Sequence, residues 1–214
     1  HEGPYVHINN PGHGRCSLYA SANALSMSLQ AFTTSFRQHV EKRQKLLQSY
    51  MKNFGKATSS NEFHLYQLTQ KCSKNRAMER WREVITYELE RLPLMVTDML
   101  ELLRHGQWHD NSMAKGAESF ANFITDVLEK RGHTDIIVIQ REASVAPIGT
   151  SLSQNTVRSM LQKKEPPFIE NALREKRLVL LLTINNGHWH TIVPTRLLVP
   201  LIEKIDKVNL STIS

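Results

Sequence analysis

The chain has 214 residues, of which 40% are hydrophobic and 22% charged, a composition typical of a globular protein rather than a disordered or fibrous one. No apolar run approaches the roughly 20 residues that a transmembrane helix needs, so we expect no membrane span. The net charge is +7, but most of the basic residues are spread over positions 37 to 177 without a dense block or interleaved aromatic residues. We therefore expect no nucleic-acid partner.

The length is sufficient for one core that carries a large insertion, and we expect a single domain over residues 1–214. The start, His1-Glu2-Gly3-Pro4, has neither an initiator methionine nor a signal-peptide pattern, which suggests a fragment of a longer protein. The two cysteines, Cys16 and Cys72, do not predict a disulfide framework and fit a reducing compartment.

The first two thirds of the chain predict mainly helices. Residues 5–9 alternate between apolar and polar and predict a short strand, followed by a glycine-bearing turn and an apolar helix that begins at Cys16. The spacing of apolar residues predicts further helices over 33–53, 62–72, 75–104 and 112–131. A loop is expected over 55–61, and Pro93 should kink or restart the helix that contains it.

After Gly132 the pattern changes to short β-branched runs that indicate buried strands. Strands are expected over 135–140, 177–184 and 188–193, a loop over 144–153, helices over 154–164 and 169–176, and a last helix from Leu197. Asn185-Asn186-Gly187 is a turn of the kind that joins two strands of a hairpin. The sequence therefore predicts an α+β fold with a small sheet near the C-terminus.

Cys16 is the first candidate for chemistry because it lies at the start of a helix. Unpaired backbone N–H groups and the helix dipole stabilise an anion there, which favours the reactive thiolate. The turn formed by His13, Gly14 and Arg15 can direct further N–H groups inward as an oxyanion hole. The alternative is a buried structural cysteine after an ordinary turn.

His188 is the second candidate, because a thiolate enzyme needs an imidazole that accepts the thiol proton and later gives one to the leaving amine. Asn186 is the candidate that orients this ring, and His190 is the alternative. His188 and His190 project to the same face of a strand, a spacing that also suits zinc, with Cys16, His13 or His7 completing the site. A zinc-binding protein is therefore an alternative interpretation.

Two motifs resemble the ovarian tumour (OTU) family of cysteine deubiquitinases. His13-Gly14-Arg15-Cys16 with the following Ser17-Leu18-Tyr19 is similar to the family's Asp-Gly-X-Cys turn and catalytic helix. Gly187-His188-Trp189 resembles the strand that carries the family's catalytic histidine and the aromatic residue after it. The chain departs from the family pattern at His13, where Asp is usual, and at His190, where many members have Asp or Asn.

The resemblance implies a papain-like catalytic core formed by both ends of the chain. The large helical middle is similar to the Lot-type subgroup of Legionella effectors, which implies that residues 33–131 form an inserted ubiquitin-binding lobe. It further implies a secreted bacterial effector that cleaves ubiquitin or polyubiquitin in the host cytoplasm, with no cofactor. The alternative to the enzyme is a helical ubiquitin-binding module whose catalytic residues are inactive.

Overall fold

The computed structural model describes residues 3–11, 14–105, 113–184 and 187–198, with the side chains of 113–119 left aside. The chain folds into two compact units, one formed by residues 1–32 and 106–214 and the other by Thr33–His105. The fold is mixed α and β, as the sequence predicts, and no described helix is both long enough and apolar enough to cross a membrane.

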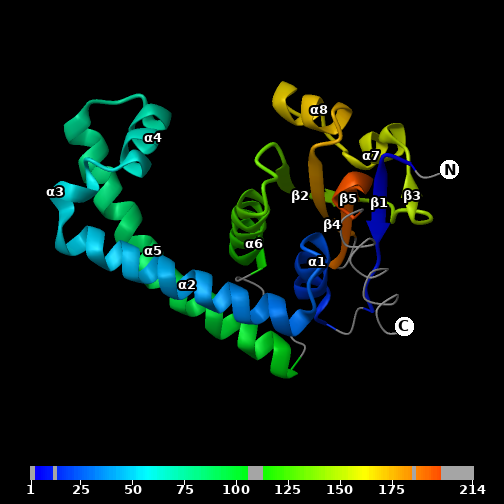
Figure 1. Ribbon diagram of the computed structural model, residues 1–214, viewed down its shortest axis with the longest axis horizontal. Coiled ribbons are helices and arrows are strands. Elements are labelled where there is room, and N and C mark those ends of the chain that lie inside the picture. The colour runs from blue at the N-terminus through cyan, green and yellow to red at the C-terminus, as the bar shows by residue number, and fades with distance from the viewer. Residues whose placement is uncertain (1–2, 12–13, 106–112, 185–186, 199–214) are drawn as a thin grey trace, which may run out of the picture. The chain divides into compact units, whose positions relative to one another are not determined.

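The first unit is built on a five-stranded mixed sheet with the strand order β2-β4-β5-β1-β3. The strands are β1 (Tyr5–Ile8), β2 (Ile137–Ala143), β3 (Ser151–Leu152), β4 (Leu178–Ile184) and β5 (His188–Pro194). β2 and β4 are parallel, and the other neighbours are antiparallel. The N-terminal strand thus lies between β5 and β3, inside a sheet whose other strands all come from the second half of the chain (Figure 1).

Helices cover both faces of this sheet. They are α1 (Cys16–Ala24), α6 (Met113–Lys130), α7 (Gln154–Met160) and α8 (Pro167–Arg174), and a 3₁₀ turn, η1 (Thr195–Leu197), follows β5. Two of these helices begin where the sequence supplies a start signal. Ser153 caps α7 by accepting a hydrogen bond from the Thr156 backbone N–H, and Pro167 occupies the first position of α8.

Alternation along β4 and β5 divides the core into two sides. One side carries Leu178, Leu180, Leu182 and Ile192, which pack with buried side chains of α7 and α8. The opposite side carries Trp189 and Thr191, and α1 packs there.

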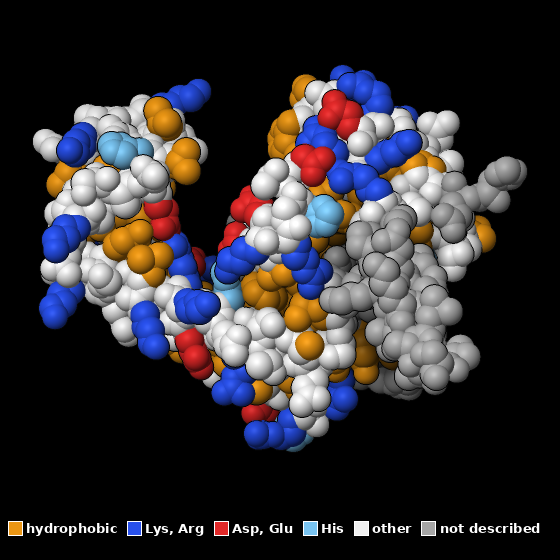
Figure 2. Space-filling view, in the orientation of Figure 1, with side chains coloured by type: hydrophobic (Ala, Val, Ile, Leu, Met, Phe, Trp, Pro, Cys, Tyr) orange, Lys and Arg blue, Asp and Glu red, His pale blue; other side chains and the backbone are white. Residues whose placement is uncertain are grey.

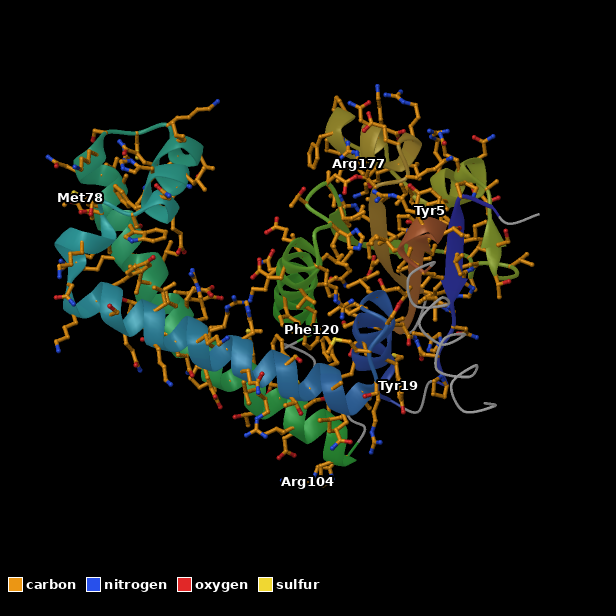
Figure 3. The ribbon with its side chains drawn as sticks, in the orientation of Figure 1. Tyr5, Tyr19, Met78, Arg104, Phe120 and Arg177 are labelled. Carbon is orange, nitrogen blue, oxygen red and sulfur yellow. The ribbon has the colours of Figure 1, made fainter. Side chains whose placement is uncertain are left out.

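β1 is anchored to the α8 side of this core by Tyr5, labelled in Figure 3. The Tyr5 hydroxyl is buried and donates a hydrogen bond of 2.6 Å to the Leu173 carbonyl at the end of α8. Burial raises the Tyr5 pKa to about 12, although a backbone hydrogen bond and two arginines oppose the shift. The phenol therefore stays neutral and keeps its hydrogen-bond donor through the physiological range.

The second unit is helical. It contains most of α2 (Leu29–Lys52), together with α3 (Phe54–Ala57), α4 (Asn61–Gln70) and α5 (Lys74–His105). Trp81 on α5 is the centre of its aromatic core, with ring centroids of Phe63 and Tyr66 at 5.9 and 5.0 Å. Arg43 on α2 and Glu62 on α4 form an ion pair of 2.6 Å that joins these helices.

Several predicted boundaries differ from the structure. The loop expected over 55–61 contains the short helix α3, and the loop expected over 144–153 contains β3. α5 continues through Pro93 as one helix rather than restarting there. The helix expected from Leu197 lies mostly outside the described residues.

The second compact unit ends at His105, before the end of the range 33–131 predicted for an inserted lobe. α6 belongs to the first unit because its apolar face packs there. Phe120 and Phe123 of α6 form edge contacts with Phe32, with ring centroids 5.7 and 5.5 Å apart. The spacing of apolar residues is helical on both sides of the boundary between the two units, so the sequence pattern did not reveal that boundary. The packing contacts of α6 define it.

Candidate active site

Gly14 and Arg15 are the described part of the turn predicted before Cys16. Gly14 adopts a φ of +76°, a conformation that favours glycine, and α1 begins at Cys16 directly after Arg15. Arg15 caps the helix only through its carbonyl, which accepts a hydrogen bond of 3.1 Å from the Tyr19 N–H. The first turn of α1 holds no acidic residue, so its backbone N–H groups meet no competing carboxylate from this helix.

Two hydrogen bonds bring this turn and helix to β5. The buried Thr191 hydroxyl donates to the Ala20 carbonyl of α1 over 2.6 Å. The Asn10 side-chain amide donates to the Trp189 carbonyl, also over 2.6 Å. Residues from opposite ends of the sequence are therefore held together at the start of β5.

The Cys16 thiol lies against the backbone beside His188. Its sulfur is 3.5 Å from the Gly187 carbonyl oxygen, to which the thiol donates, and backbone hydrogen bonding from Trp189 also reaches the sulfur. Gly187 and Trp189 flank His188 in the sequence, so the thiol faces the stretch of β5 that carries this histidine. This arrangement agrees with the prediction from the sequence that folding brings these two segments together.

The ionisation predicted for Cys16 is wrong in direction. Burial raises the pKa of the thiol, whereas the helix start was expected to lower it. Backbone hydrogen bonds from Trp189, Ser17 and Cys16 itself lower the pKa but are the smaller effect. Only 6% of Cys16 is exposed, so loss of hydration outweighs the amide groups that face the sulfur.

The His188 ring contacts His190 rather than the sulfur. The two ring centroids are 4.6 Å apart and the rings are nearly perpendicular, at 86°. Both side chains project from the face of β5 opposite to Thr191, as strand alternation requires. Among the interactions of these described residues, no hydrogen bond joins the Cys16 thiol to the His188 ring.

A third histidine, His7 of β1, completes this cluster. His7 Nε2 and His190 Nδ1 are 2.8 Å apart, and His7 Nδ1 is 3.1 Å from the Gly149 carbonyl. Both rings are buried. Burial and the neighbouring histidines lower the His190 pKa to about 4, and burial followed by the charge of His188 lowers the His7 pKa. Both rings are therefore neutral at pH 7.

The remaining predicted site residues have different outcomes. Asn186, predicted to orient His188, and His13 of the oxyanion turn lie outside the described residues. Gly14 and Arg15 are in the predicted turn, and His190, the alternative orienting residue, contacts the His188 ring. Within the described ranges, no three His, Cys, Asp or Glu side chains are placed to share a metal ion.

Two contributors to the site were not assigned these roles from the sequence. His7 was considered only as a zinc ligand, and Asn10 only as part of a turn. The apolar-polar alternation of residues 5–9 placed His7 on a strand, but the partner of that strand is far away in the sequence. The bond between His7 and His190 spans 183 residues and depends on the pairing of β1 with β5.

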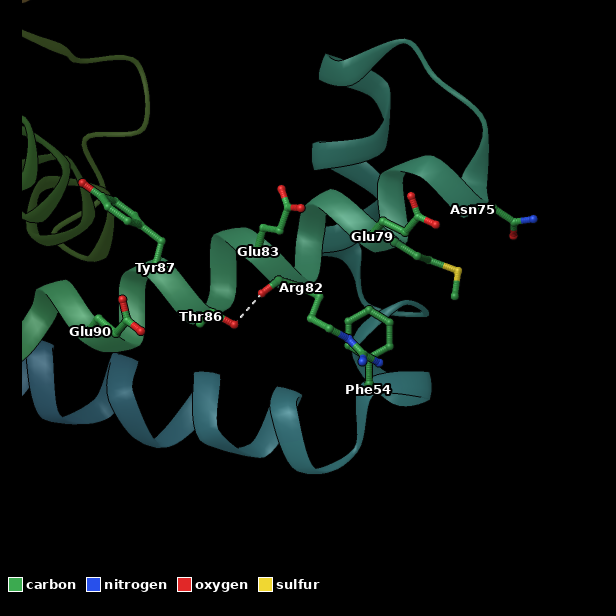
Figure 4. A pocket seen from close by; sticks show the side chains of 9 residues that line it. Phe54, Asn75, Glu79, Arg82, Glu83, Thr86, Tyr87 and Glu90 are labelled. Carbon is green, nitrogen blue, oxygen red and sulfur yellow. Dashed lines mark hydrogen bonds between the residues drawn. The ribbon is translucent and has the colours of Figure 1, made fainter.

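The second unit carries an open pocket of about 830 Å³ on α3 and α5 (Figure 4). Its wall combines Phe54, Tyr87 and three glutamates, with the Arg82 guanidinium 4.5 Å from the centre of the Phe54 ring. On the visible faces of both units, lysine and arginine side chains are scattered, with acidic side chains beside some of them (Figure 2). This pattern gives no sign of a basic groove on those faces.

Comparison with known proteins leaves the site to be interpreted from its own geometry. No protein-family model matches the sequence, and neither the curated proteins nor the solved structures compared with it gave a significant match.

Proposed function

We propose that the chain is a cysteine-dependent isopeptidase of the OTU deubiquitinase type, with a papain-like core. The observation that carries the proposal is the contact of the Cys16 sulfur, at the start of α1, with the Gly187 carbonyl directly before His188, at 3.5 Å. Thiol proteases pair a helix-borne thiol with a strand-borne imidazole, and here the thiol contacts the residue that directly precedes the histidine. The two OTU-like motifs contain these same residues.

In the proposed reaction, the Cys16 thiol transfers its proton to His188 and the sulfur attacks the carbonyl of a ubiquitin C-terminal glycine joined to a lysine amine. The C–N bond then breaks, and the protonated His188 gives its proton to the departing amine. Water attacks the resulting thioester, passes a proton through His188 and releases the carboxylate and the free thiol. Backbone N–H groups of the turn that precedes Cys16 stabilise the negative oxygen in both steps.

The starting state of this reaction is a protonated, buried thiol. Its sulfur must leave the Gly187 carbonyl, and the His188 ring must turn so that one of its nitrogens reaches the sulfur while the other stays toward His190. His188 is only half-buried, which supports such a rotation. Binding of the substrate tail supplies the carbonyl that the thiol attacks, so we expect activation on binding rather than a resting ion pair.

Ubiquitin and polyubiquitin are proposed as substrates on the basis of the motif resemblance. The same resemblance supports the action of a secreted bacterial effector in a host cytoplasm. The helical unit Thr33–His105 is the proposed ubiquitin-binding lobe, and its acidic pocket in Figure 4 supports binding of a basic partner surface.

A ubiquitin-based electrophilic probe tests the proposal directly. The wild-type chain should form a covalent adduct seen as a mass increase, and Cys16→Ala should not. Cys72→Ala is the matched control because it removes the other free cysteine, which is half-buried in the helical unit. Lack of adduct with the wild-type chain, or adduct formation that requires Cys72, would contradict the proposal.

The second candidate function is a ubiquitin-binding module without activity. It is favoured by the buried thiol with a raised pKa and by the orientation of His188 toward His190. Calorimetric binding of ubiquitin that is the same in wild type, Cys16→Ala and His188→Ala, combined with no turnover of a diubiquitin substrate, would select this candidate.

A further inference from the structure

The three histidines at the β1–β5 edge form a chain of contacts that ends on a backbone carbonyl. The order is His188, His190, His7 and the Gly149 carbonyl oxygen, joined by a ring contact and two hydrogen bonds of 2.8 and 3.1 Å. His188 is half-buried, whereas His190 and His7 are buried, with 6% and 7% of their surface exposed. In the buried part of this series of contacts, the donor and the acceptor of each hydrogen bond follow from the carbonyl oxygen at its end.

The Gly149 carbonyl can only accept, so His7 Nδ1 must carry the hydrogen of that bond. His7 is neutral, which leaves its Nε2 without a hydrogen, and His190 Nδ1 must therefore donate to it. His190 is also neutral, so its own Nε2 has no hydrogen. One backbone carbonyl thus fixes both tautomers.

We propose that His7 is a positioning residue, which holds His190 in the Nδ1–H tautomer so that its unprotonated Nε2 provides an acceptor beside the His188 ring. The inference rests on the proposed function, in which His188 gains a positive charge when it takes the Cys16 proton. An imidazole nitrogen then serves where thiol proteases use an amide or carboxylate oxygen to orient and stabilise the charged ring.

The surrounding charges favour this assignment. On the same face of the sheet, Arg141 of β2 is paired with Glu165 at 2.8 Å, and between α7 and α8 Arg158 is paired with Glu170 at 3.3 Å. Each pair is internally neutralised, and Tyr5 of β1 stays un-ionised. The charges that lower the pKa values of His7 and His190 come from within the histidine cluster.

Histidine nitrogen NMR tests the tautomers without relying on activity. With ¹⁵N-labelled histidine, His7 and His190 of the full chain should show a protonated Nδ1 and a bare Nε2 at pH 7. His7→Phe should abolish the fixed tautomer of His190, whereas His64→Phe, which removes an exposed histidine of the helical unit, should leave it intact. A protonated Nε2 on His190 in the wild type, or an unchanged His190 pattern in His7→Phe, would overturn the proposal.

Kinetics with a fluorogenic ubiquitin substrate provide the second readout. His7→Phe should lower kcat about tenfold with little change in KM, the size expected for one lost orienting hydrogen bond. His190→Asn, which retains an acceptor, should keep more activity than His190→Phe. Thermal melts would show that each variant is folded. An unchanged kcat in folded His7→Phe would overturn the positioning role, whereas failure of the wild type to react with the ubiquitin probe would overturn only the proposed function.

Discussion

The bond between Thr191 and Ala20 gives a sharp test of how the site is assembled. Thr191→Val replaces a fully buried hydroxyl by a methyl group at almost constant volume, so little cavity forms. The variant loses a hydrogen bond of 2.6 Å between β5 and α1 and leaves a carbonyl less well satisfied. We expect a loss of about 1 to 2 kcal/mol in the free energy of unfolding, measured by urea denaturation.

The same variant should expose the thiol more often. Because only 6% of Cys16 is exposed, a thiol reagent reacts with it mainly after α1 moves away from β5. A loss of 1 to 2 kcal/mol at that contact should speed labelling of Cys16 by up to about 5- to 30-fold, measured by mass spectrometry in a Cys72→Ser background.

Thr86→Val is the matched control. The Thr86 hydroxyl also donates to a carbonyl, that of Arg82 at 2.9 Å, but it lies on the exposed face of α5 (Figure 4). Its loss should change stability by less than about 0.5 kcal/mol and leave labelling unchanged. Equal effects of the two substitutions on stability and labelling would refute the view that Thr191 secures α1 to the sheet.

Three further predictions concern the core and the titrating groups. Tyr5→Phe removes the bond to the Leu173 carbonyl and should lower the free energy of unfolding by about 1 kcal/mol in urea, and no loss would contradict the anchoring of β1 to α8. His190 has a folded pKa of about 4 against 6.5 unfolded, so its contribution to stability should be present above pH 6.5 and lost, by up to about 3 kcal/mol, as the pH falls to 4. Urea midpoints across that range should fall less for His190→Asn, and an equal fall would contradict the assignment. Phe63→Ala should cost about 3 to 4 kcal/mol in a thermal melt because Phe63 is fully buried, whereas Leu68→Ala, at a position 72% exposed, should change little.

The sequence predicts the elements well where their patterns are local. The apolar run of β4 and the glycine turn before β5 identify the hairpin, and the spacing of apolar residues identifies α2, α4 and α5. β3 was missed because two residues are too few to form a pattern. α3 was missed because Gly55 and its polar neighbours resemble a loop.

The sequence predicted the two main residues of the site better than it predicted their surroundings. Cys16 and His188 are indicated by local motifs, and the structure brings their segments together. The pKa of Cys16 was predicted with the wrong sign because its burial depends on the packing of α1 against β5. The role of His7 depends on the register in which β1 pairs with β5. The residues next to His7 in the sequence do not specify that register.

The position of β1 has a consequence for biosynthesis. Its partner strand β5 is made much later than β1, since β5 begins at His188 while β1 begins at Tyr5. A nascent chain on the ribosome carries the Cys16 helix long before the strand that shelters it emerges. Such high contact order predicts slow folding of this unit, and the Cys16 thiol should stay open to solvent until β5 has been synthesised.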